Sequence, residues 1–538
     1  MHQYYINSCD HPLYKSFQDL YRTSFPLFEQ RSVTQQTEAF QNEQYKLLVF
    51  TENDTFLGFI SYWLFGTYCY VEHFAVNTDL RGKGYGSHLL GTFIRSTDKI
   101  VLLEIDPITD SISEARLRFY KKCGFYENPY PHKHPAYRHE YQPHPLIVLT
   151  TKRKISKDEY LKFNLDLNIT VMNKAIKVKT AIIFGGKSAE HEVSLKSASN
   201  VSNSMDRTKF IPLLLAVDKS GKWFYNDKYV SDKVNLADND YFIGAIPVYL
   251  SATGNSVNVV DQKENKVLAN FNIAFPIIHG TFGEDGTLQG ILKSLNIPFV
   301  GPDILGSSIA MDKDVTKRLL KAANIPVANS YTLYKHIPNE YSFQEIVSNL
   351  GLPVFVKPAN AGSSVGVSKV TDETEYHTAL EAAFRFDNKI LVEEAVIGKE
   401  LECGVLGNEE PQASVVGEIV ATETFYSYEA KYIHSDGAAL QVPARIEAHI
   451  SDEIRHLAVK ACKAICCEGM ARVDFLLSSE NKLVLNEINT LPGFTEISMY
   501  PKMWEAAGIT EKELITKLII YAIQRHDRNA DLSTEIGK

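Results

Sequence analysis

The sequence predicts a multidomain α/β protein, and three observations lead to this. Its 538 residues are enough for three or more domain-sized units, each with its own core. Apolar stretches of strand length run into glycine turns and helical patterns at residues 70–94 and again from residue 176. Apolar residues over 472–490 enclose acidic ones in two short runs that predict a β-hairpin. Strands that alternate with helices favour α/β folds.

Two changes in amino-acid composition divide the chain. Residues 1–150 are rich in aromatic side chains and end in a loop whose histidines alternate with proline and tyrosine. Packing, rather than metal binding, is expected of these histidines, which are His132, His134, His139 and His144. The charged stretch 151–175 is expected to be a linker. A fresh strand followed by Gly185 and Gly186 then begins a second α/β region at residue 176.

Composition excludes several function classes. A net charge of −9 gives no basic footprint for nucleic acid, and no polybasic cluster of the lipid-binding kind stands out. No apolar run approaches the ~18 residues of a spanning helix, and the polar start does not fit a secretory signal. The seven scattered cysteines indicate reduced thiols. We therefore expect a cytoplasmic protein with no nucleic-acid partner and no membrane insertion.

A phosphate cradle is predicted near residue 84. An alternating strand over 70–76 is followed by a turn with Gly82, Gly84 and Gly86, and then by helical spacing. Backbone N–H groups that have no partner at the N-terminus of a helix bind phosphate groups well. The glycine spacing does not match the dinucleotide G-x-G-x-x-G pattern, which argues against a Rossmann site.

The pattern Arg81-x-x-Gly84-x-Gly86, with the later run Ala115-Arg-Leu-Arg-Phe-Tyr120-Lys-Lys-Cys-Gly-Phe125, resembles the GNAT-type N-acetyltransferases over residues 3–145. The resemblance implies that acetyl-CoA is held by Arg81, Gly82, Lys83, Gly84, Tyr85 and Gly86. It also implies that Tyr120 protonates the departing thiolate. Glu72 and Glu104 are candidates for the general base. The acceptor is not specified by the sequence, and a domain that only senses acetyl-CoA stays an alternative.

The predicted hairpin carries the triplet Asp474, Glu487 and Asn489. Strand alternation places Glu487 and Asn489 on one face, where Asp474 of the partner strand can meet them. Three hard oxygen side chains suit Mg²⁺, which completes its shell with nucleotide phosphates. The flanking apolar residues favour this metal site over a solvated sheet face, because buried carboxylates need a cation or partners.

Further segments suit a nucleotide. Lys357 ends a buried-type strand, and the small residues after it, 360–367, predict a flexible flap over phosphates. The strand ending in Glu393 and Glu394 could face an adenine edge with its backbone, and Glu400 could take ribose hydroxyls. Gly-Lys-Ser at 186–188 is not a Walker loop, because residue 181 is alanine where that motif needs glycine.

In this order, the segments from about 176 to 525 resemble the ATP-grasp ligases, and among them the D-alanine–D-alanine ligase family. The matching runs begin at Gly185, His279, Met311, Lys357, Phe425, Arg472 and Asn486. The resemblance implies three subdomains over 176–308, 309–396 and 397–530, ATP as a substrate, two Mg²⁺ or Mn²⁺ ions, and a homodimer.

The same resemblance implies roles for single residues. ATP would be bound by Lys313, Lys357, Ser364, Glu393, Glu394, Glu400 and Lys431, with metal on Asp474, Glu487 and Asn489. Arg472 and the amide of Gly493 would stabilise a tetrahedral oxyanion. Glu190, linked through Ser363 to Tyr432, would hold the ammonium of the first D-alanine. His279 would lie near its carboxylate, while Ser498 and Met499 would meet the second substrate.

Relatives use D-lactate or D-serine as the second substrate. Tyr432 disfavours D-lactate, since ligases of that type lack the lid tyrosine. The pair Ser498-Met499 favours D-alanine over D-serine, because an apolar methionine offers no partner to a serine hydroxyl. A buried hydroxyl without a partner costs about 1–3 kcal/mol. A ligase-like scaffold without activity is the remaining alternative, disfavoured by the intact motifs.

Overall fold

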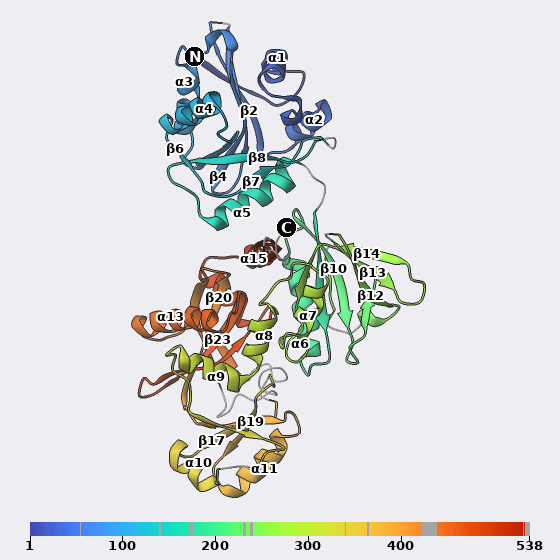
Figure 1. Ribbon diagram of the computed structural model, residues 1–538, viewed down its shortest axis with the longest axis vertical. Coiled ribbons are helices and arrows are strands. Elements are labelled where there is room, and N and C mark those ends of the chain that lie inside the picture. Colours follow the sequence, from blue (N-terminus) through green and yellow to red (C-terminus); the bar gives the residue numbers. More distant parts are fainter. Residues whose placement is uncertain are drawn as a thin grey trace, which may run out of the picture. The chain divides into compact units, whose positions relative to one another are not determined.

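The computed structural model describes residues 1–53, 55–138, 141–172, 177–229, 233–236, 240–254, 256–338, 341–362, 365–421, 438–530 and 532. The chain divides into two compact units, Met1–Ile176 and Lys177–Lys538 (Figure 1). Both combine helices with sheets, so the prediction of a multidomain α/β protein is confirmed. All seven cysteines are free thiols. Among the described residues, no helix has the length and apolar character needed to cross a bilayer.

The N-terminal unit is built on one eight-stranded sheet. Its order is β1 (His2–Ile6), β2 (Tyr45–Glu52), β3 (Thr55–Leu64), β4 (Tyr68–Val76), β5 (Ile100–Ile105), β8 (His144–Thr151) and β6 (Phe125–Glu127), with β7 (His132–His134) also on β8. Of the strands described in this sheet, only β4 and β5 pair in parallel, and their paired residues run from Tyr68 with Ile100 to Val71 with Leu103. The two strands continue past that point without pairing to each other.

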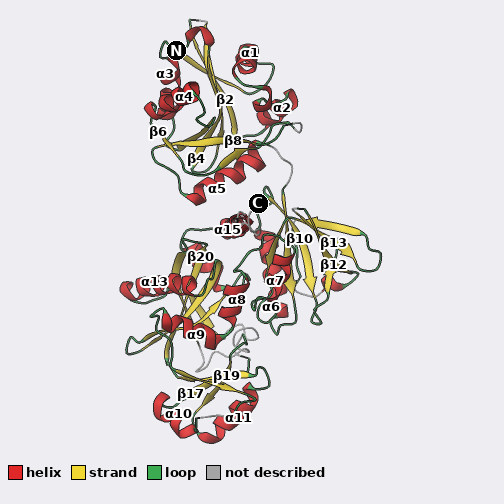
Figure 2. Ribbon diagram, in the orientation of Figure 1, coloured by secondary structure: helices red, strands yellow, loops and turns green. Residues whose placement is uncertain are grey.

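Helices cover both faces of this sheet (Figure 2). On one face lie α1 (Tyr14–Ser24), α2 (Val33–Gln41) and α5 (Lys157–Asp166), which share a core with Phe59, Trp63 and Leu102. On the other lie α3 (Tyr85–Arg95) and α4 (Ser111–Lys122), which pack on Leu103 and Ile105. Short helical turns complete the unit: η1 (Leu27–Glu29), η2 (Thr78–Leu80) and η3 (Leu167–Val171).

The stretch 151–175, expected to be a linker, is packed structure over most of its length. It contains the end of β8, α5 and η3, and it buries Tyr160, Phe163 and Leu167 in the core of the N-terminal unit. The basic residues of this stretch whose burial is described are exposed, which is why composition alone suggested a solvated connection, whereas Asp166 is buried and accepts a hydrogen bond from Tyr68. The division between the two units falls after residue 176.

The second unit begins with a seven-stranded sheet. Its order is β14 (Val267–Phe271), β13 (Ser256–Asp261), β12 (Ile246–Thr253), β11 (Trp223–Tyr225), β10 (Phe210–Val217), β9 (Val178–Gly185) and β15 (Ile273–Pro276). The strands β10, β9 and β15 are parallel and largely buried. The associated helices are α6 (His191–Ser204), α7 (Thr287–Ser294) and the short turn η4 (Asp240–Phe242).

Two antiparallel sheets follow. The first has the order β16 (Ser330–Tyr334), β19 (Lys389–Glu394), β17 (Val354–Pro358) and β18 (Ser368–Val370). Its core is closed on one face by α10 (Phe343–Leu350) and α11 (Glu373–Ala383) (Figure 2). The second has the order β22 (Ala438–Gln441), β21 (Gln412–Ala421), β20 (Gly398–Gly407), β23 (Gly469–Ser478) and β24 (Leu483–Asn489).

The five-stranded sheet has one apolar and one polar face. Alternation along β23 sends Val473 and Phe475 into a core with α13 (Ala448–Ala464) and α9 (Lys313–Ala322). The opposite face carries Arg472 and Asp474. The remaining helices are α8 (Ile304–Met311), α14 (Met499–Ala506) and α15 (Glu511–Ala530). The predicted hairpin is therefore confirmed as β23 and β24.

Candidate functional site

The acidic hairpin brings the predicted triplet together. Asp474 on β23 lies directly opposite Glu487 on β24, and Arg472 lies opposite Asn489. Asn489 donates a hydrogen bond from Nδ2 to Asp474 Oδ2 at 2.9 Å. Because its NH₂ group is used in this way, the amide oxygen of Asn489 is left to face the same side as the two carboxylates.

Arg472 is held by two carboxylates. Its Nε and Nη2 donate to both oxygens of Asp474, at 2.8 and 2.7 Å, and its Nε lies 3.1 Å from Glu402 Oε2. Glu402 lies opposite Asp474 on β20 and is only 4% exposed. Planar, two-point pairing of this kind fixes the orientation of a guanidinium.

The donor set of the hairpin fits a hard cation. Asp474, Glu487 and Asn489 offer two carboxylates and one amide oxygen from adjacent strands. Carboxylate and amide oxygens are the ligands that Mg²⁺ accepts, and it usually keeps water or substrate phosphates for the rest of its shell. Within the described part of the chain, no group of three or more His, Cys, Asp and Glu side chains offers a metal site made of those residues alone.

Two lysines reach the hairpin from other elements. Lys313, the first residue of α9, lies 3.4 Å from Glu487 Oε2 and donates at 2.7 Å to the carbonyl of Ala361. Lys357, on β17, lies 3.4 Å from Asn486 Oδ1, the residue before Glu487. Lys313 therefore borders the oxygen triplet directly, and Lys357 reaches the residue next to it.

Glu393 is buried between two lysines. Its carboxylate lies 2.7 Å from Lys357 Nζ and 3.2 Å from Lys317 Nζ. Burial opposes its charge, but the two ammonium groups outweigh burial and lower the pKa of Glu393. Glu394 instead pairs with Lys482 at 2.8 Å and accepts from the amide of Asn329. The two neighbouring acids thus point to different partners, as alternation along a strand requires.

Glu400 lies two residues before Glu402 on β20. It pairs in register with Leu476 of β23 and Ile419 of β21. Alternation along β20 places Glu400 on the same face as Glu402 and opposite to Leu401, which lies in the core. Glu400 therefore shares the polar face of the sheet with the hairpin acids.

His279 holds the loop after the hairpin. Its Nδ1 donates to the carbonyl of Leu491 at 2.8 Å, and its Nε2 lies 3.2 Å from Ser197 Oγ. Ser197 Oγ also accepts from the amide of Phe494. Burial lowers the pKa of His279, which keeps the ring neutral and lets Nε2 accept from the serine. This chain of bonds anchors the segment that contains Gly493.

Glu190 lies against two glycines. A Cβ on Gly280 would come within 3.1 Å of Glu190 Oε2, and one on Gly362 within 3.4 Å. Gly280 has φ +73°, a conformation that favours glycine in any case. Glu190, in the turn before α6, therefore approaches the backbone that leads into the predicted flap.

Gly493 approaches the next candidate residue. A Cβ there would meet Ser498 Oγ at 2.8 Å, so this close approach requires glycine. Ser498 Oγ accepts from the amide of Thr495 at 2.9 Å at the start of α14. The side chain of Met499 is buried, with its sulfur against Gly417 of β21, where a Cβ would come within 2.6 Å.

Four predicted site residues lie outside the described residues. These are Ser363, Ser364, Lys431 and Tyr432.

The cradle of the N-terminal unit has the predicted form. Gly82 and Gly84 have φ +79° and +83°, values that strongly favour glycine, and Gly84 caps the start of α3. The turn over 81–86 therefore places its amides at the positive end of the helix. Tyr120 on α4 packs on Phe125, and burial raises its pKa to about 12. A phenol of this kind keeps its proton at neutral pH.

Neither suggested general base has a free carboxylate. Glu72 is the residue skipped by the register shift between β3 and β4, and it binds Arg31 at 2.7 Å, Trp63 and Tyr137. Burial opposes its charge, yet Arg31 lowers the pKa of Glu72.

The carboxylate of Glu104 is also held by buried partners. It pairs with His132, accepts from Tyr70 and lies 3.7 Å from His134. Burial opposes its charge, but His134 and His132 lower the pKa of Glu104 to about 2. Both carboxylates are held by buried partners in the core, and the strand pattern gave no sign of these partners in distant loops.

Three residues next to the predicted sites were missed. Glu402 holds Arg472, Lys317 pairs with Glu393, and Glu284 accepts from the amides of Gly280 and Leu491 at 2.7 and 2.9 Å. Burial and the charge of Glu190 raise the pKa of Glu284 to about 7. For Glu402, an acid amid the apolar residues of β20 was a usable signal, since a buried acid needs a partner.

Three family models match stretches of the chain. The family model "D-ala D-ala ligase N-terminus" matches residues 179–302, "D-ala D-ala ligase C-terminus" matches 319–520, and "Acetyltransferase (GNAT) family" matches 13–125. D-alanine–D-alanine ligase of Oceanobacillus iheyensis is 50% identical over 367 residues, which cover 67% of this chain and 99% of that protein. D-alanine–D-alanine ligase A of Escherichia coli K12 is 50% identical, over 66% and 99%.

Solved structures match the chain as well. The D-alanine–D-alanine ligase of Coxiella burnetii matches with a TM-score of 0.58 and 36% identity, over 66% of this chain and 97% of that one. The D-Ala:D-Ser ligase VanG of Enterococcus faecalis matches with a TM-score of 0.58 and 37% identity, over 64% and 99%. Residues 177–538 thus carry an ATP-grasp ligase fold, fused to a GNAT acetyltransferase domain. The chain belongs to the D-alanine–D-alanine ligase family.

Proposed function

We propose that the second unit joins two D-alanine molecules to D-alanyl-D-alanine at the expense of ATP, for peptidoglycan precursor synthesis. The observation that carries this is the oxygen triplet Asp474, Glu487 and Asn489, bordered by Lys313, with Lys357 at the residue next to it. A carboxylate is a poor electrophile, so it must first receive the γ-phosphoryl group of ATP as an acyl phosphate. The amine of the second D-alanine then attacks, and phosphate leaves.

The hairpin residues would hold Mg²⁺ or Mn²⁺, which offsets phosphate charge during the transfer. Lys313 and Lys357 supply point charges to the same phosphate oxygens. Lys357 now pairs with Glu393, so a phosphate that binds here competes for its ammonium group. The segment with Ser364, together with Glu393, Glu394, Glu400 and Lys431, completes the proposed nucleotide site.

The acyl-transfer step would use the same polar face of the hairpin, next to the proposed metal ligands. Arg472 and the amide of Gly493 stabilise the oxyanion that forms when the second amine attacks. Glu190, with Ser363 and Tyr432, holds the ammonium of the first D-alanine, and His279 lies near its carboxylate. Ser498 takes the carboxylate of the second D-alanine, with Met499 beside it. The apolar side chain of Met499 beside this position favours D-alanine as the second substrate, because it offers no partner to a serine hydroxyl.

Competition separates the two second substrates. The purified protein receives ATP, Mg²⁺ and limiting D-alanine together with excess D-serine, and the dipeptides are separated by mass. We expect D-alanyl-D-alanine as the main product. Predominant D-alanyl-D-serine would assign the alternative activity.

For the N-terminal unit we propose acetyl transfer from acetyl-CoA to an amine. The turn over 81–86 would hold the pyrophosphate, and Tyr120 would protonate the departing CoA thiolate. The GNAT family match and the positive φ of Gly82 and Gly84 support this. Calorimetry with acetyl-CoA, followed by thiol release with an amine panel, tests it. Binding without release by any amine would favour a sensor domain.

A further inference from the structure

A polar cluster lies where β4 and β5 separate. Pairing ends at Val71 and Leu103, and the next residues include His73 and Glu104. Alternation along β5 places Glu104 on the same face as Leu102, which shares its core with α1 and α2. The CoA cradle at the start of α3 belongs to the opposite face. The point where β4 and β5 separate thus lies between the face that carries the predicted CoA cradle and the face that carries the polar cluster.

Glu29 enters the cluster from η1. Its backbone carbonyl accepts from His73 Nε2 at 2.9 Å, which fixes the end of η1 beside β4. Its side chain is 21% exposed, so it has contact with solvent, whereas Glu72 is buried against Arg31 and Glu104 against His132. Glu29 is therefore the carboxylate at this place that can exchange a proton with an entering molecule.

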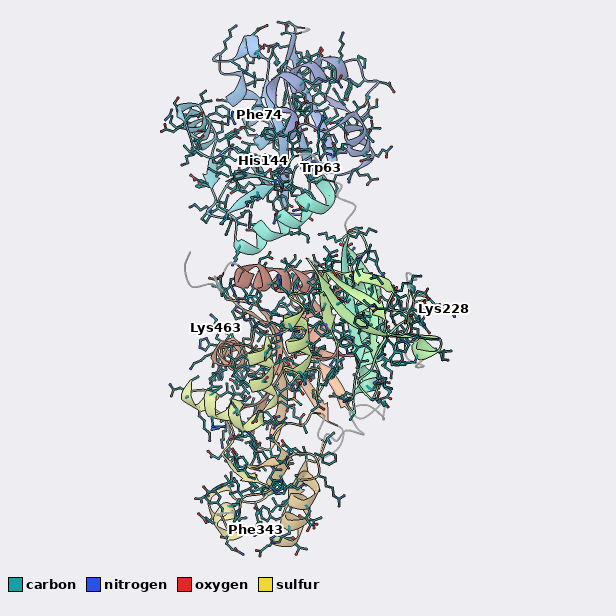
Figure 3. All side chains as sticks on the ribbon, turned by 45° about the vertical axis from the view of Figure 1, so that its right-hand side comes forward. Trp63, Phe74, His144, Lys228, Phe343 and Lys463 are labelled. Atoms are coloured by element: carbon teal, nitrogen blue, oxygen red, sulfur yellow. The ribbon has the colours of Figure 1, made fainter. Side chains whose placement is uncertain are left out.

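His144 faces Glu29. Its Nε2 lies 3.7 Å from Glu29 Oε1, and its ring packs edge-on against Phe28 and beside His134. Both ring nitrogens are shielded from solvent, and neither has a hydrogen-bond partner among the described residues. Buried polar atoms are normally satisfied, so an unsatisfied pair next to an acid points to a missing partner. Figure 3 labels His144 among the side chains of the N-terminal unit.

Burial and the surrounding charges set the protonation states of Glu29 and His144. Asp106 and Arg116 form an ion pair at the exposed rim, with side chains 48% and 45% exposed. Burial and then Asp106 raise the pKa of Glu29 to about 7, with a smaller effect of Glu104 in the same direction, while Arg116 opposes them. Burial and His134 lower the pKa of His144. At neutral pH the pair thus offers a neutral imidazole and a carboxyl that gains or loses a proton readily.

We propose that Glu29 and His144 form the acceptor site of the N-terminal unit, and that this site takes a protonated primary amine. The inference rests on the proposed acetyltransferase activity. Glu29 accepts one proton of the ammonium group, and the freed amine attacks the carbonyl carbon of acetyl-CoA. A C–N bond forms and the C–S bond breaks. The sulfur takes a proton from Tyr120, and the second amine proton passes through solvent to restore Tyr120. Glu29 releases the first amine proton to solvent. The net products are the amide, CoA and one proton.

Amine binding is tested without catalysis. The full-length protein, labelled on its histidine rings, is titrated with ethylammonium chloride at constant ionic strength, and His144→Gln assigns the His144 signal. We expect a saturable shift of that signal which is lost in Glu29→Gln and kept in Glu43→Gln, a substitution at an exposed acid of the same unit. The other histidine signals report whether Glu29→Gln folds. No saturable shift in the wild type, or an equal shift in Glu29→Gln, overturns the proposal.

Catalysis supplies the second readout, with ethylamine as the acceptor and release of CoA thiol as the signal. The wild-type rate should rise with pH through about 7, and Glu29→Gln should lose this limb and fall by ~100-fold with unchanged acetyl-CoA affinity. An unchanged rate and pH profile in Glu29→Gln overturns the acceptor site but leaves the acetyltransferase function standing. If the protein binds the amine at His144 but does not bind acetyl-CoA, the proposed acetyltransferase function is overturned while the amine site is supported.

Discussion

The guanidinium of Arg472 holds both carboxylate oxygens of Asp474, at 2.8 Å from Nε and 2.7 Å from Nη2. Asp474 is also the carboxylate proposed to bind a divalent cation, so a cation and Arg472 share it. Glu402, 3.1 Å from Arg472 Nε, is a second anchor that would keep the guanidinium in place if Asp474 bound the proposed cation. The proposed phosphoryl-transfer and oxyanion sites are thus joined through one side chain.

Arg472→Ala should lower dipeptide synthesis by about 10²–10³-fold, because a preorganised donor to the oxyanion is lost. ATP binding, measured by calorimetry, should change far less. Arg385→Ala removes an exposed arginine of the same unit and serves as the control. Turnover in Arg472→Ala equal to that of the control would remove Arg472 from the mechanism.

Glu402→Gln should weaken Mn²⁺ binding by roughly tenfold, which corresponds to about 1.4 kcal/mol. With Glu402 neutral, Asp474 becomes the only carboxylate that pairs with Arg472, and the cation competes with it less well. Electron paramagnetic resonance of free Mn²⁺, in the presence of a non-hydrolysable ATP analogue, measures this. Glu453→Gln, at an exposed position of α13, should leave the affinity unchanged. Equal affinities in both variants would show that Glu402 has no part in metal binding.

Glu393→Ala should destabilise the protein by about 3–5 kcal/mol, because it leaves the buried ammonium groups of Lys357 and Lys317 without their counter-ion. The double variant Glu393→Gln with Lys317→Met removes one acid and one base together and should recover much of this loss. Urea unfolding of the two variants gives the comparison. If the double variant is as unstable as Glu393→Ala, charge compensation is not the cause.

Stability of the N-terminal unit should fall in acid because of Glu104. The pKa of Glu104 is lowered from 4.5 to about 2 in the folded protein, so between these values the unfolded state binds more protons. The contribution, on the order of 3 kcal/mol, is complete above pH 4.5 and is lost as the pH falls through about 2.

The measurement uses 5-fluorotryptophan, since Trp63 lies in the N-terminal unit and reports its urea unfolding by ¹⁹F NMR between pH 3 and 6. Glu104→Gln should be less stable at pH 6 and should lose most of the pH slope. Glu43→Gln should behave like the wild type. A slope that survives in Glu104→Gln would assign it to another group.

The sequence predicted the hairpin and the cradle, because both depend on local patterns. Alternation alone places Glu487 beside Asp474, and the glycines at 82 and 84 specify the turn before α3. Partners brought from distant segments were not predictable in this way. Arg31 lies 41 residues before Glu72, and His132 lies 28 residues after Glu104, so the fate of both acids depended on tertiary packing.

The same reason explains the error at 151–175. The lysines of α5 in this stretch are exposed, and its buried Phe163 packs against Tyr68 and Tyr70 of β4, more than 90 residues earlier in the chain. A local pattern could not show that this helix completes the core of the N-terminal unit.

The most direct test follows the oxygen atoms of D-alanine. The protein is given ATP, Mg²⁺ and D-alanine labelled with ¹⁸O in its carboxylate, and the released phosphate is analysed by mass. We expect one labelled oxygen in each phosphate formed, in step with ADP and D-alanyl-D-alanine, since the carboxylate must have carried the phosphoryl group. Dipeptide formed with unlabelled phosphate, or no dipeptide at all, would contradict the account.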